Sequence, residues 1–527
     1  MDTNTLLNQF EADKIISRIW KRDHTVWKPD PTEITNRLGW LDIMQRVQPE
    51  LPSLENLRES LLDEGYTHVL LLGMGGSSLA PDVFAKTFPD AKGLHLAVLD
   101  STDPGAVLAA DRSHNPAHTL YIVATKSGGT VETLAFLHYF YNRALKTLGE
   151  AEAGRHFIAI TDPGSKLEKL AQAHNFRAAY LNDPDIGGRF SALSFFGLLP
   201  ATLRGVDTVQ LSQHAIQAAI TCAPDAPLEQ NPGAQIGIKI AAAALQGRDK
   251  LTFVLSPKIA AFGDWVEQLI AESTGKEGRG ILPVVGEPLG NPNVYGKDRY
   301  FVHIGIEGEP PIAALDALEA AGHPVMRISL ADRYALGEQF FIWEFATAVA
   351  GHILGINPFD QPNVESAKVM ARRMMKTYRE TGSLPAGKSA PLSKEALAGF
   401  LEAAVPGDYF SLQAYLTPTP QTEAALQRIR LWVRDTKKLA TTLGFGPRFL
   451  HSTGQLHKGD RGNGLFVQIT SDAGDDLAIP DGMGGDTSSV TFQTLKMAQA
   501  LGDAAALEQA GRRVLRLHIT GDGELEI

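Results

Sequence analysis

The sequence has almost no cysteine and no long apolar run, and these absences exclude several protein classes. Cys222 is the single cysteine among 527 residues, so the chain cannot form an internal disulfide, which suits a reducing compartment. No stretch approaches the roughly 18 consecutive apolar residues of a membrane-spanning helix. The N-terminal stretch mixes acidic and apolar residues and lacks the apolar centre of a signal peptide. We therefore expect a cytoplasmic protein that does not bind membranes.

Positive charge is also in deficit. The chain has 49 Lys and Arg against 60 Asp and Glu, a formal net charge of -11. Broad nucleic-acid-binding surfaces are normally basic, so we expect no nucleic-acid partner. No group of His, Cys and carboxylate residues has a convincing metal-ligand spacing, and we expect no metal and no other cofactor. A local cationic pocket remains compatible with this charge.

The glycine-rich motifs of nucleotide-binding proteins are incomplete. A dinucleotide fingerprint G-x-G-x-x-G beginning at Gly73 needs glycine at position 78, where the chain has Ser78. Asp100, at the end of the next apolar run, would otherwise suit a ribose. The nucleotide P-loop pattern G-x-x-x-x-G-K-[ST] is absent from the loop T-K-S-G-G-T. These departures favour a smaller anion than a nucleotide.

Two small-residue loops, each directly after an apolar run, are the most informative features present. G-M-G-G-S-S (73–78) follows the run 69–72, and T-K-S-G-G-T (125–130) follows the run 121–124. Such runs predict buried parallel strands that lead into helix N-termini, where N–H groups and the helix dipole favour an anion. Loops at the carboxyl ends of neighbouring strands can line one crevice. We predict a site for a small phosphorylated ligand. Lys126 points either toward this ligand or to water.

The chain is too long for one core, and its pattern divides it into several regions. Alternation of strands and helices predicts an α/β fold with doubly wound parallel sheets. We expect a helical segment over 1–60 and then a first α/β domain over 61–205, with strands near 69–72, 94–99, 120–124 and 157–160. A second α/β domain is expected over 206–378, with strands near 251–255, 300–306 and 324–328. A linker over 379–393 leads to a C-terminal α/β region over 394–527, with helices through Leu439 and strands near 465–469 and 513–519.

Two further segments carry candidate reactive groups. In I-G-G-R-F-S, Gly187 and Gly188 let the backbone approach a ligand, and Arg189 supplies a planar cation that can stabilise an oxyanion. Glu272 lies near the end of an amphipathic helix that stops at Gly275, and is a candidate general base. A salt-bridged arginine and a solvated glutamate are the plainer structural interpretations.

The segment N-P-F-D-Q-P-N-V-E-S-A-K predicts a helix start. Asp360 can cap this helix and Pro362 suits its first turn. Gln361 and Lys368 are seven residues apart, close to two helical turns, so both can face one site. The plainer interpretation is a capped surface helix with a solvated lysine.

Together these motifs resemble the phosphoglucose isomerase family. The resemblance includes G-M-G-G-S-S, T-K-S-G-G-T, G-G-R-F-S, the E-S-x-G-K type segment at Glu272 and F-D-Q-x-x-V-E-x-x-K, all in the family's order across residues 73–368. It implies two sugar-isomerase (SIS) domains of three α/β/α layers, with a C-terminal extension. The chain looks closest to the isomerase half of the bifunctional transaldolase/phosphoglucose isomerases.

The resemblance also implies an activity and roles. The activity is the interconversion of glucose 6-phosphate and fructose 6-phosphate in glycolysis and gluconeogenesis, without a cofactor and commonly in a homodimer. Glu272 would move a proton between C2 and C1 through a cis-enediolate that Arg189 stabilises. The other implied roles are phosphate binding by Ser77, Thr125, Ser127 and Thr130, lining of the loops by Gly76, Lys126 and Gly188, substrate orientation by Gln361 and assistance at the ring oxygen by Lys368.

One departure from the family concerns the ring-opening histidine. The family usually carries it some twenty to thirty residues after the catalytic glutamate, and this chain has none there. His303 follows, inside a predicted strand where a structural role is expected. Some bacterial members have L-H-S-x-G-Q around this histidine, which His451 matches, with His457 as the second candidate. Our hypothesis is that the C-terminal region folds back, or reaches a neighbouring subunit, to supply it; otherwise both are ordinary loop residues.

Two alternatives stay open at this point. One is a related isomerase that also accepts mannose 6-phosphate. The other is a sugar-phosphate sensor that kept the phosphate loops and lost catalysis. Because Glu272, Arg189 and Lys368 are all present, the sequence favours the enzyme.

Overall fold

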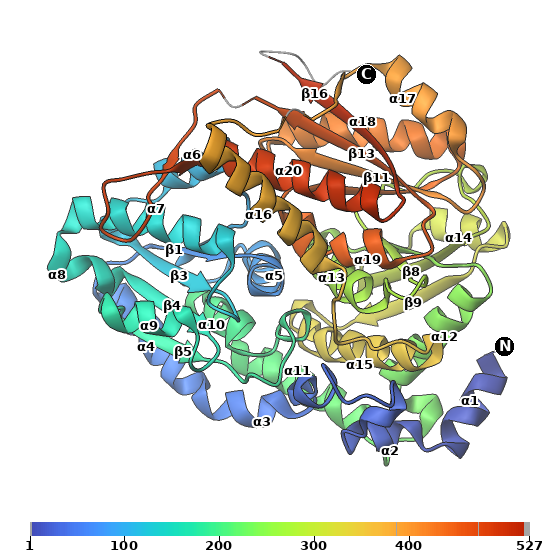
Figure 1. Ribbon diagram of the computed structural model, residues 1–527. Coiled ribbons are helices and arrows are strands. Elements are labelled where there is room, and N and C mark those ends of the chain that lie inside the picture. Colours follow the sequence, from blue (N-terminus) through green and yellow to red (C-terminus); the bar gives the residue numbers. More distant parts are fainter. Residues whose placement is uncertain (1–2, 386, 473, 521–527) are drawn as a thin grey trace.

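The structure, a computed structural model, describes residues 3–385, 387–472 and 474–520, and three parallel sheets organise it (Figure 1). The ends of the expected first and last segments, residues 1–2 and 521–527, lie outside the described residues, as do 386 in the expected linker and 473. Among the described residues, four α-helices precede the first sheet: α1 (Thr3–Ala12), α2 (Ile15–Trp20), α3 (Ile43–Val47) and α4 (Leu51–Asp63).

The first sheet has the order β2-β1-β3-β4-β5, with every pair parallel. Since β1 lies between β2 and β3, the loops after β1 and β3 leave the same edge at the point where the strand order reverses, the usual ligand position in such sheets. Its elements are β1 (His68–Gly73), α5 (Leu79–Thr87), β2 (His95–Leu99), α6 (Pro104–Ser113), β3 (Thr119–Ala124), α7 (Val131–Leu148), α8 (Glu150–Ala153), β4 (Phe157–Thr161), α9 (Lys166–Ala173), β5 (Ala178–Leu181) and α10 (Phe195–Arg204).

The second sheet repeats this topology with four parallel strands in the order β7-β6-β8-β9. Helices α12 and α15 share a core with one face of it, and α14 packs on the other. Its elements are α11 (Thr208–Thr221), α12 (Pro232–Leu245), β6 (Lys250–Leu255), α13 (Phe262–Thr274), β7 (Leu282–Val284), β8 (Arg299–Ile306), α14 (Ala313–Ala320), β9 (Val325–Leu330) and α15 (Leu336–Leu354).

The third sheet, in the C-terminal region, has five parallel strands in the order β10-β16-β13-β11-β12. Helix α16 (Val364–Thr381) leads to it from the second sheet. The other elements are β10 (Ala390–Pro391), α17 (Lys394–Phe400), β11 (Tyr409–Tyr415), α18 (Pro420–Lys437), β12 (Ala440–Phe445), α19 (Gly454–Gly459), β13 (Gly464–Ser471), the small hairpin β14 (Ala478–Ile479) and β15 (Val490–Thr491), α20 (Phe492–Gln509) and β16 (Arg513–Ile519).

The expectation of helices through Leu439 is wrong at β11. Its residues Tyr409–Tyr415 form a fully buried central strand. Ser411 and Gln413 interrupt the apolar run in the sequence, which hides the strand, but both side chains are buried. The short strands β5 and β7 and the strand β12 are also additions to the predicted set. The α/β class with doubly wound parallel sheets is confirmed, whereas the domain boundaries remain a proposal.

Aromatic side chains join the first two sheets. Phe340 of α15 packs against Phe84 of α5 and against Phe262 and Trp265 of α13, with ring centroids 4.7–5.6 Å apart. These residues belong to one large core that includes strands of both sheets. The two α/β units are therefore fixed against each other, and the loops they carry form a rigid frame.

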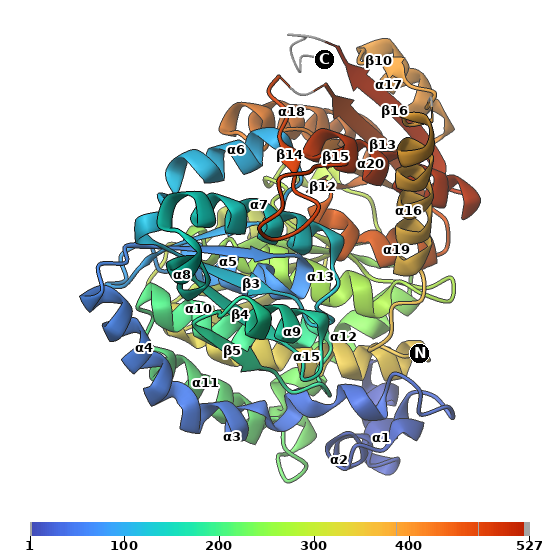
Figure 2. The ribbon, with the colours of Figure 1, turned by 60° about the vertical axis from the view of Figure 1, so that its left-hand side comes forward.

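The C-terminal region packs across both α/β units. Phe492 and Leu495 of α20 join the core on the α7 face of the first sheet, and Leu456 and Tyr409 join a cluster with Leu282 of β7. Figures 1 and 2 show this region, orange to red, above both units from two directions. The C-terminal region is therefore within reach of the loops at the carboxyl ends of the first sheet's strands.

Gly275 permits the closest of these approaches. A methyl group on its Cα would overlap the backbone and side chain of Leu456 in α19. We expect Gly275→Ala to lower the free energy of unfolding by about 1–3 kcal/mol, the usual cost of an overpacked core. Denaturant unfolding measures it. Gly399→Ala in α17, where nothing lies within 4 Å, is the control and keeps or raises stability; equal stability of both variants would contradict the packing argument.

Candidate functional site

The loops of all three regions meet in one cleft of about 300 Å³. It is lined by loops after β1 and β3, the turn before α10, the end of α13, the start of α16 and the turn before α19. Every predicted site residue except His457 lines it: Gly76, Ser77, Thr125, Lys126, Ser127, Thr130, Gly188, Arg189, Glu272, Gln361, Lys368 and His451.

Hydroxyl groups gather at the N-terminal end of α7, on the side of the first sheet. The Oγ1 atoms of Thr125 and Thr130 lie 2.9 Å apart, and the backbone N–H of Gly129 donates to Ser127 Oγ. Gly128 has a φ of 69°, which lets the loop turn back on itself. With Ser77 on the neighbouring loop, this arrangement offers hydroxyl and N–H donors to an anion at the positive end of the helix dipole.

Lys126 lines the cleft but is already paired. Its Nζ contacts Asp162 Oδ2 and donates to the carbonyl of Pro184 at 2.8 Å. Burial raises the pKa of Asp162, and Lys126 opposes that effect. The ammonium is therefore a shared positive charge at the rim, neither fully solvated nor free for a ligand.

Arg189 is buried, with 2% of its side chain exposed, and every neighbour it bonds is an acceptor. Nη2 donates to the carbonyls of Pro358 and Asp360 at 2.7 and 2.9 Å. Its other contacts are Nε to Ser273 Oγ at 2.7 Å, Nη1 to Gln361 Oε1 at 2.9 Å and Nη1 to Glu272 Oε1 at 3.5 Å. Burial lowers its pKa, but a guanidinium stays protonated in proteins. The cleft thus has a fixed cation beside Glu272.

Glu272 is held from the same helix. Gln268, one turn earlier on α13, donates through Nε2 to Glu272 Oε2 at 3.1 Å and to the carbonyl of His451 at 2.7 Å. This residue was not predicted from the sequence, although the i,i+4 spacing on one helix face indicates such a contact. Gln268 ties the carboxylate to the turn that carries the histidine.

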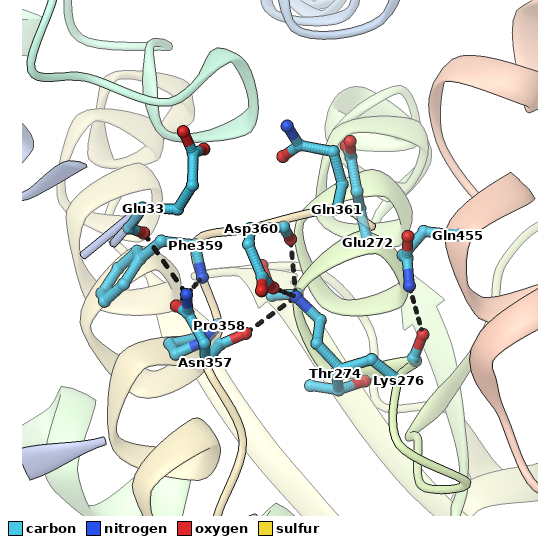
Figure 3. A network of polar contacts seen from close by, with 12 residues as sticks. Glu33, Glu272, Thr274, Lys276, Asn357, Pro358, Phe359, Asp360, Gln361 and Gln455 are labelled. Atoms are coloured by element: carbon cyan, nitrogen blue, oxygen red, sulfur yellow. Dashed lines mark hydrogen bonds and ion pairs between the residues drawn. The ribbon is translucent and has the colours of Figure 1, made fainter. Parts of the chain in front are cut away.

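Lys276 organises the turn that follows α15. Its Nζ donates to the carbonyls of Asn357 and Asp360 and to Asp360 Oδ1, at 2.6–2.8 Å (Figure 3). Burial and the nearby Arg189 together lower the pKa of Lys276 to about 8. Gln361 and Glu272, also labelled in Figure 3, both contact Nη1 of Arg189.

The role expected for Asp360 is therefore wrong. It does not cap α16, whose N-cap is Asn363, because its carboxylate pairs with Lys276. Pro362 precedes that helix instead of lying in its first turn. Sequence reasoning noted Lys276 only as the residue after Gly275 and missed its function as the cation that holds this turn. Lys368, exposed on α16, still reaches the cleft as its spacing from Gln361 predicts.

His451 reaches the cleft from the C-terminal region of the same chain. Its Nε2 lies 2.9 Å from Glu132 Oε1 at the start of α7. Burial alone would raise the pKa of Glu132, but the attraction of His451 lowers it below the ordinary value. Because an ionised carboxylate only accepts, Nε2 carries a proton. Glu132 was also missed, since T-V-E-T suggests only a helix start.

The glycines of the first loop make room for other loops. A methyl group on Gly76 would overlap the carbonyl of Gly188, and one on Gly75 would clash with the carbonyl of His451. The family resemblance implies that Gly76 lines the loop; the structure shows that Gly75 and Gly76 also admit the turns carrying Arg189 and His451.

His457 does not reach the cleft. It is 1% exposed, between β11 and β13, with its ring 5.0 Å from that of Phe466. Burial lowers its pKa well below the ordinary value, so it is a neutral core residue. His303 lies in β8, as expected.

Asp100 serves the fold. It accepts from Ser78 Oγ at 3.1 Å and lies 3.4 Å from Arg448 Nε. Arg448 also pairs with Asp82 and Asp264, which anchors the turn ending at His451. Three carboxylates around one guanidinium leave none for a ribose.

No group of three or more metal-ligating side chains occurs in the part of the chain that the structure describes. Over those same residues, none of the helices has the length and hydropathy needed to cross a bilayer.

Comparison with known proteins gives this cleft a family context. Residues 59–279 match the sequence model of the family described as phosphoglucose isomerase. A glucose-6-phosphate isomerase of Thermus thermophilus is 29% identical over 390 residues, 64% of this chain and 90% of the relative. One of Thermosynechococcus vestitus is 29% identical over 382 residues, 64% of this chain and 71% of the relative. The resemblance is confirmed; the closer likeness to the bifunctional enzymes stays a prediction.

Solved structures agree on the architecture. The crystal structure of a hypothetical protein from Thermus thermophilus matches with a TM-score of 0.61 and 26% identity, over 71% of this chain and 97% of that one. A glucose-6-phosphate isomerase from Chlamydia trachomatis matches with a TM-score of 0.51 and 19% identity, over 70% and 78%. The second likeness concerns the fold alone. The paired α/β units are therefore arranged as in these two structures.

The buried ammonium of Lys276 makes stability depend on pH. Its pKa is about 8 in the folded chain and about 10.4 in an unfolded chain. Between these values the unfolded chain holds a proton that the folded chain has released, so Lys276 makes the free energy of unfolding rise with pH. The free energy of unfolding of wild type minus that of Lys276→Met should increase by on the order of 2–3 kcal/mol from pH 7.5 to 10.5.

Chemical denaturation across that pH range measures this difference. Lys376→Met is the matched control, because that side chain is 75% exposed and the difference should stay flat. A pH-independent difference for Lys276→Met would show that the lysine is not desolvated as described.

Proposed function

We propose that this relative of phosphoglucose isomerases interconverts glucose 6-phosphate and fructose 6-phosphate. The observation that carries the proposal is the meeting of Glu272, Arg189 and His451 in one cleft that also contains the hydroxyl loops. A sugar phosphate has an anion at one end and a reacting carbonyl at the other. This cleft offers anion donors at one end and a carboxylate beside a buried cation at the other.

The phosphate would bind at the hydroxyl loops. Ser77, Thr125, Ser127 and Thr130 supply hydroxyl donors, and the N-terminal end of α7 adds its dipole. Gly76 and Gly188 would let the backbone lie close to the substrate at the entrance of the cleft. Lys126 would add positive charge at the rim without bonding the phosphate directly. This end holds the sugar without taking part in the chemistry.

Ring opening would come first. Since Nε2 of His451 donates to Glu132, the neutral ring leaves Nδ1 as its acceptor. We propose that Nδ1 takes the proton of the O1 hydroxyl while the C1–O5 bond breaks and O5 gains a proton. Lys368, on α16, is the group we assign to the ring oxygen.

Proton transfer between C2 and C1 would follow at Glu272. The carboxylate takes the C2 proton, the C2 electron pair forms the C1–C2 double bond, and the C1 oxygen becomes an enediolate oxygen. Arg189, 3.5 Å from Glu272, would stabilise that negative charge, with Gln361 orienting the substrate. A proton moves from the C2 hydroxyl to the C1 oxygen, and Glu272 returns the abstracted proton to C1, which leaves the carbonyl at C2 and gives the ketose. No redox partner is needed.

A cytoplasmic location and a homodimer remain parts of this proposal. In a dimer each protomer would use its own His451, because the cleft is lined from a single chain.

Glu272→Gln tests the base. The amide keeps the shape and cannot accept the C2 proton, so kcat should fall by about 10²–10⁴-fold, the usual share of a placed base. Fructose 6-phosphate turnover is followed through glucose 6-phosphate formation, and binding is followed by calorimetry, where affinity should change little. Glu277→Gln is the control, because Glu277 is 52% exposed and pairs with Lys28 at the surface. An inactive wild type that still binds would favour the sensor.

His451→Ala tests the ring-opening group. We expect a loss of about 100-fold in the exchange between sugar-phosphate anomers, measured by NMR saturation transfer, together with slower isomerisation. His457→Ala should instead lower the melting temperature, because it empties space in the core, and leave anomer exchange in the folded protein near wild type. Anomer exchange at the wild-type rate in His451→Ala would contradict the assignment of His451 as the ring-opening group.

A further inference from the structure

Helix α20 carries a buried polar stripe. Lys496, Gln499 and Asp503 follow each other at i, i+3 and i+7, and their residues are 0%, 5% and 0% exposed. Buried polar groups are costly unless they are hydrogen-bonded. Each is bonded to a different segment: Lys496 to Asp103 at 2.9 Å and Asp503 to Lys458 at 2.6 Å.

Gln499, in the middle of the stripe, contacts the carboxylate that binds the histidine. Its Nε2 donates to Glu132 Oε1 at 2.6 Å, and its Oε1 accepts from Thr102 Oγ1 at 2.8 Å. The hydroxyl proton of Thr102 fixes which end of the amide faces Glu132. The same Glu132 oxygen accepts from His451 Nε2 at 2.9 Å.

These contacts form a directional chain. Every donor in it points toward Glu132, so the carboxylate is held as an anion with two donors on one oxygen. That arrangement keeps the proton of His451 on Nε2 and leaves Nδ1 as the ring's acceptor. The pair of Lys496 and Asp103, joined by Thr417 at 2.6 Å, holds α20 against the loop that carries Thr102.

We propose that Gln499 is a positioning residue for ring opening, acting through Glu132 to fix the tautomer and orientation of His451. The inference rests on the proposed function for its catalytic meaning, but not for its structural content. It gives the C-terminal region two contributions to the cleft: the histidine itself and the amide that sets its partner.

Removal of the amide should change how strongly Glu132 attracts the imidazolium. Without the Gln499 donor, the negative charge of Glu132 acts more fully on His451 and stabilises its charged form. The other titratable groups that face this pair are Lys368 of α16, Tyr415 of β11 and, through Gln268, Glu272 of α13. Since none of them changes in a Gln499 variant, a shift can be assigned to the lost donor.

The kinetic test is Gln499→Leu in two backgrounds. With His451 present, kcat/KM should fall about tenfold, in line with loss of a bond to a charged group, and its acidic limb should move up by roughly half a unit to one unit. In a His451→Ala background the same change should cost less than about twofold. Equal losses in both backgrounds, or an unshifted limb, would overturn the proposal.

Gln493→Leu is the matched control on the same helix. Gln493 donates to the carbonyl of Ser471 at 3.1 Å, and we expect its replacement to leave the pH profile and kcat/KM within about twofold of wild type. An equal shift of the acidic limb in this control would assign the effect to α20 as a whole and overturn the specific role of Gln499.

A readout that does not need activity separates this inference from the proposed function. The ¹⁵N signals of the imidazoles, with His451 assigned through His451→Ala, report tautomer and titration. We expect protonation at Nε2 in wild type and a higher titration midpoint in Gln499→Leu. Unchanged signals would refute the positioning role even in an active enzyme, whereas shifted signals in an inactive protein would refute only the proposed function.

Discussion

The buried guanidinium of Arg189 is the charge on which the cleft depends. A cation without water is stable only if acceptors surround it. The turn over 357–361 supplies them through two carbonyls and the Gln361 amide, and α13 supplies Ser273 and Glu272. Satisfying one charge therefore fixes the backbone of the turn, the Gln361 side chain and the position of Glu272.

Lys276 holds the backbone of the same turn as Arg189. It donates to the carbonyls of Asn357 and Asp360 and to the Asp360 carboxylate. Two cations thus share one turn whose carbonyls face inward, and Asp360 supplies the negative charge that lets them lie together. This arrangement holds the reacting end of the cleft rigid, while the hydroxyl-rich end, with Ser127 exposed, stays open to solvent.

The sequence was sufficient to predict the residues that would touch the substrate. It was insufficient to predict the residues that hold those side chains in place. Glycine-rich loops after apolar runs, Arg189 after two glycines and Glu272 before Gly275 are local patterns, and the structure brings them together. Glu132 and Lys276 act through partners far away in the chain, and a short pattern has no sign of such contacts. Gln268 contacts Glu272 at a local i,i+4 spacing, but its contact with His451 is equally remote. Strand β11 was missed for a similar reason, because Ser411 and Gln413 are polar yet buried by tertiary packing.

The position of the last sheet in the chain has a consequence for how the molecule is assembled during synthesis. Glu132 and Gln499 are 367 residues apart in sequence, and His451 comes after both paired α/β units. Domains generally fold as they emerge, N-terminal first, so the loops at the first sheet are complete long before α20 leaves the ribosome. A nascent chain can therefore form the hydroxyl loops of the first sheet before it contains His451, and the contacts of His451 and Gln499 with Glu132 arise only after α20 has been made.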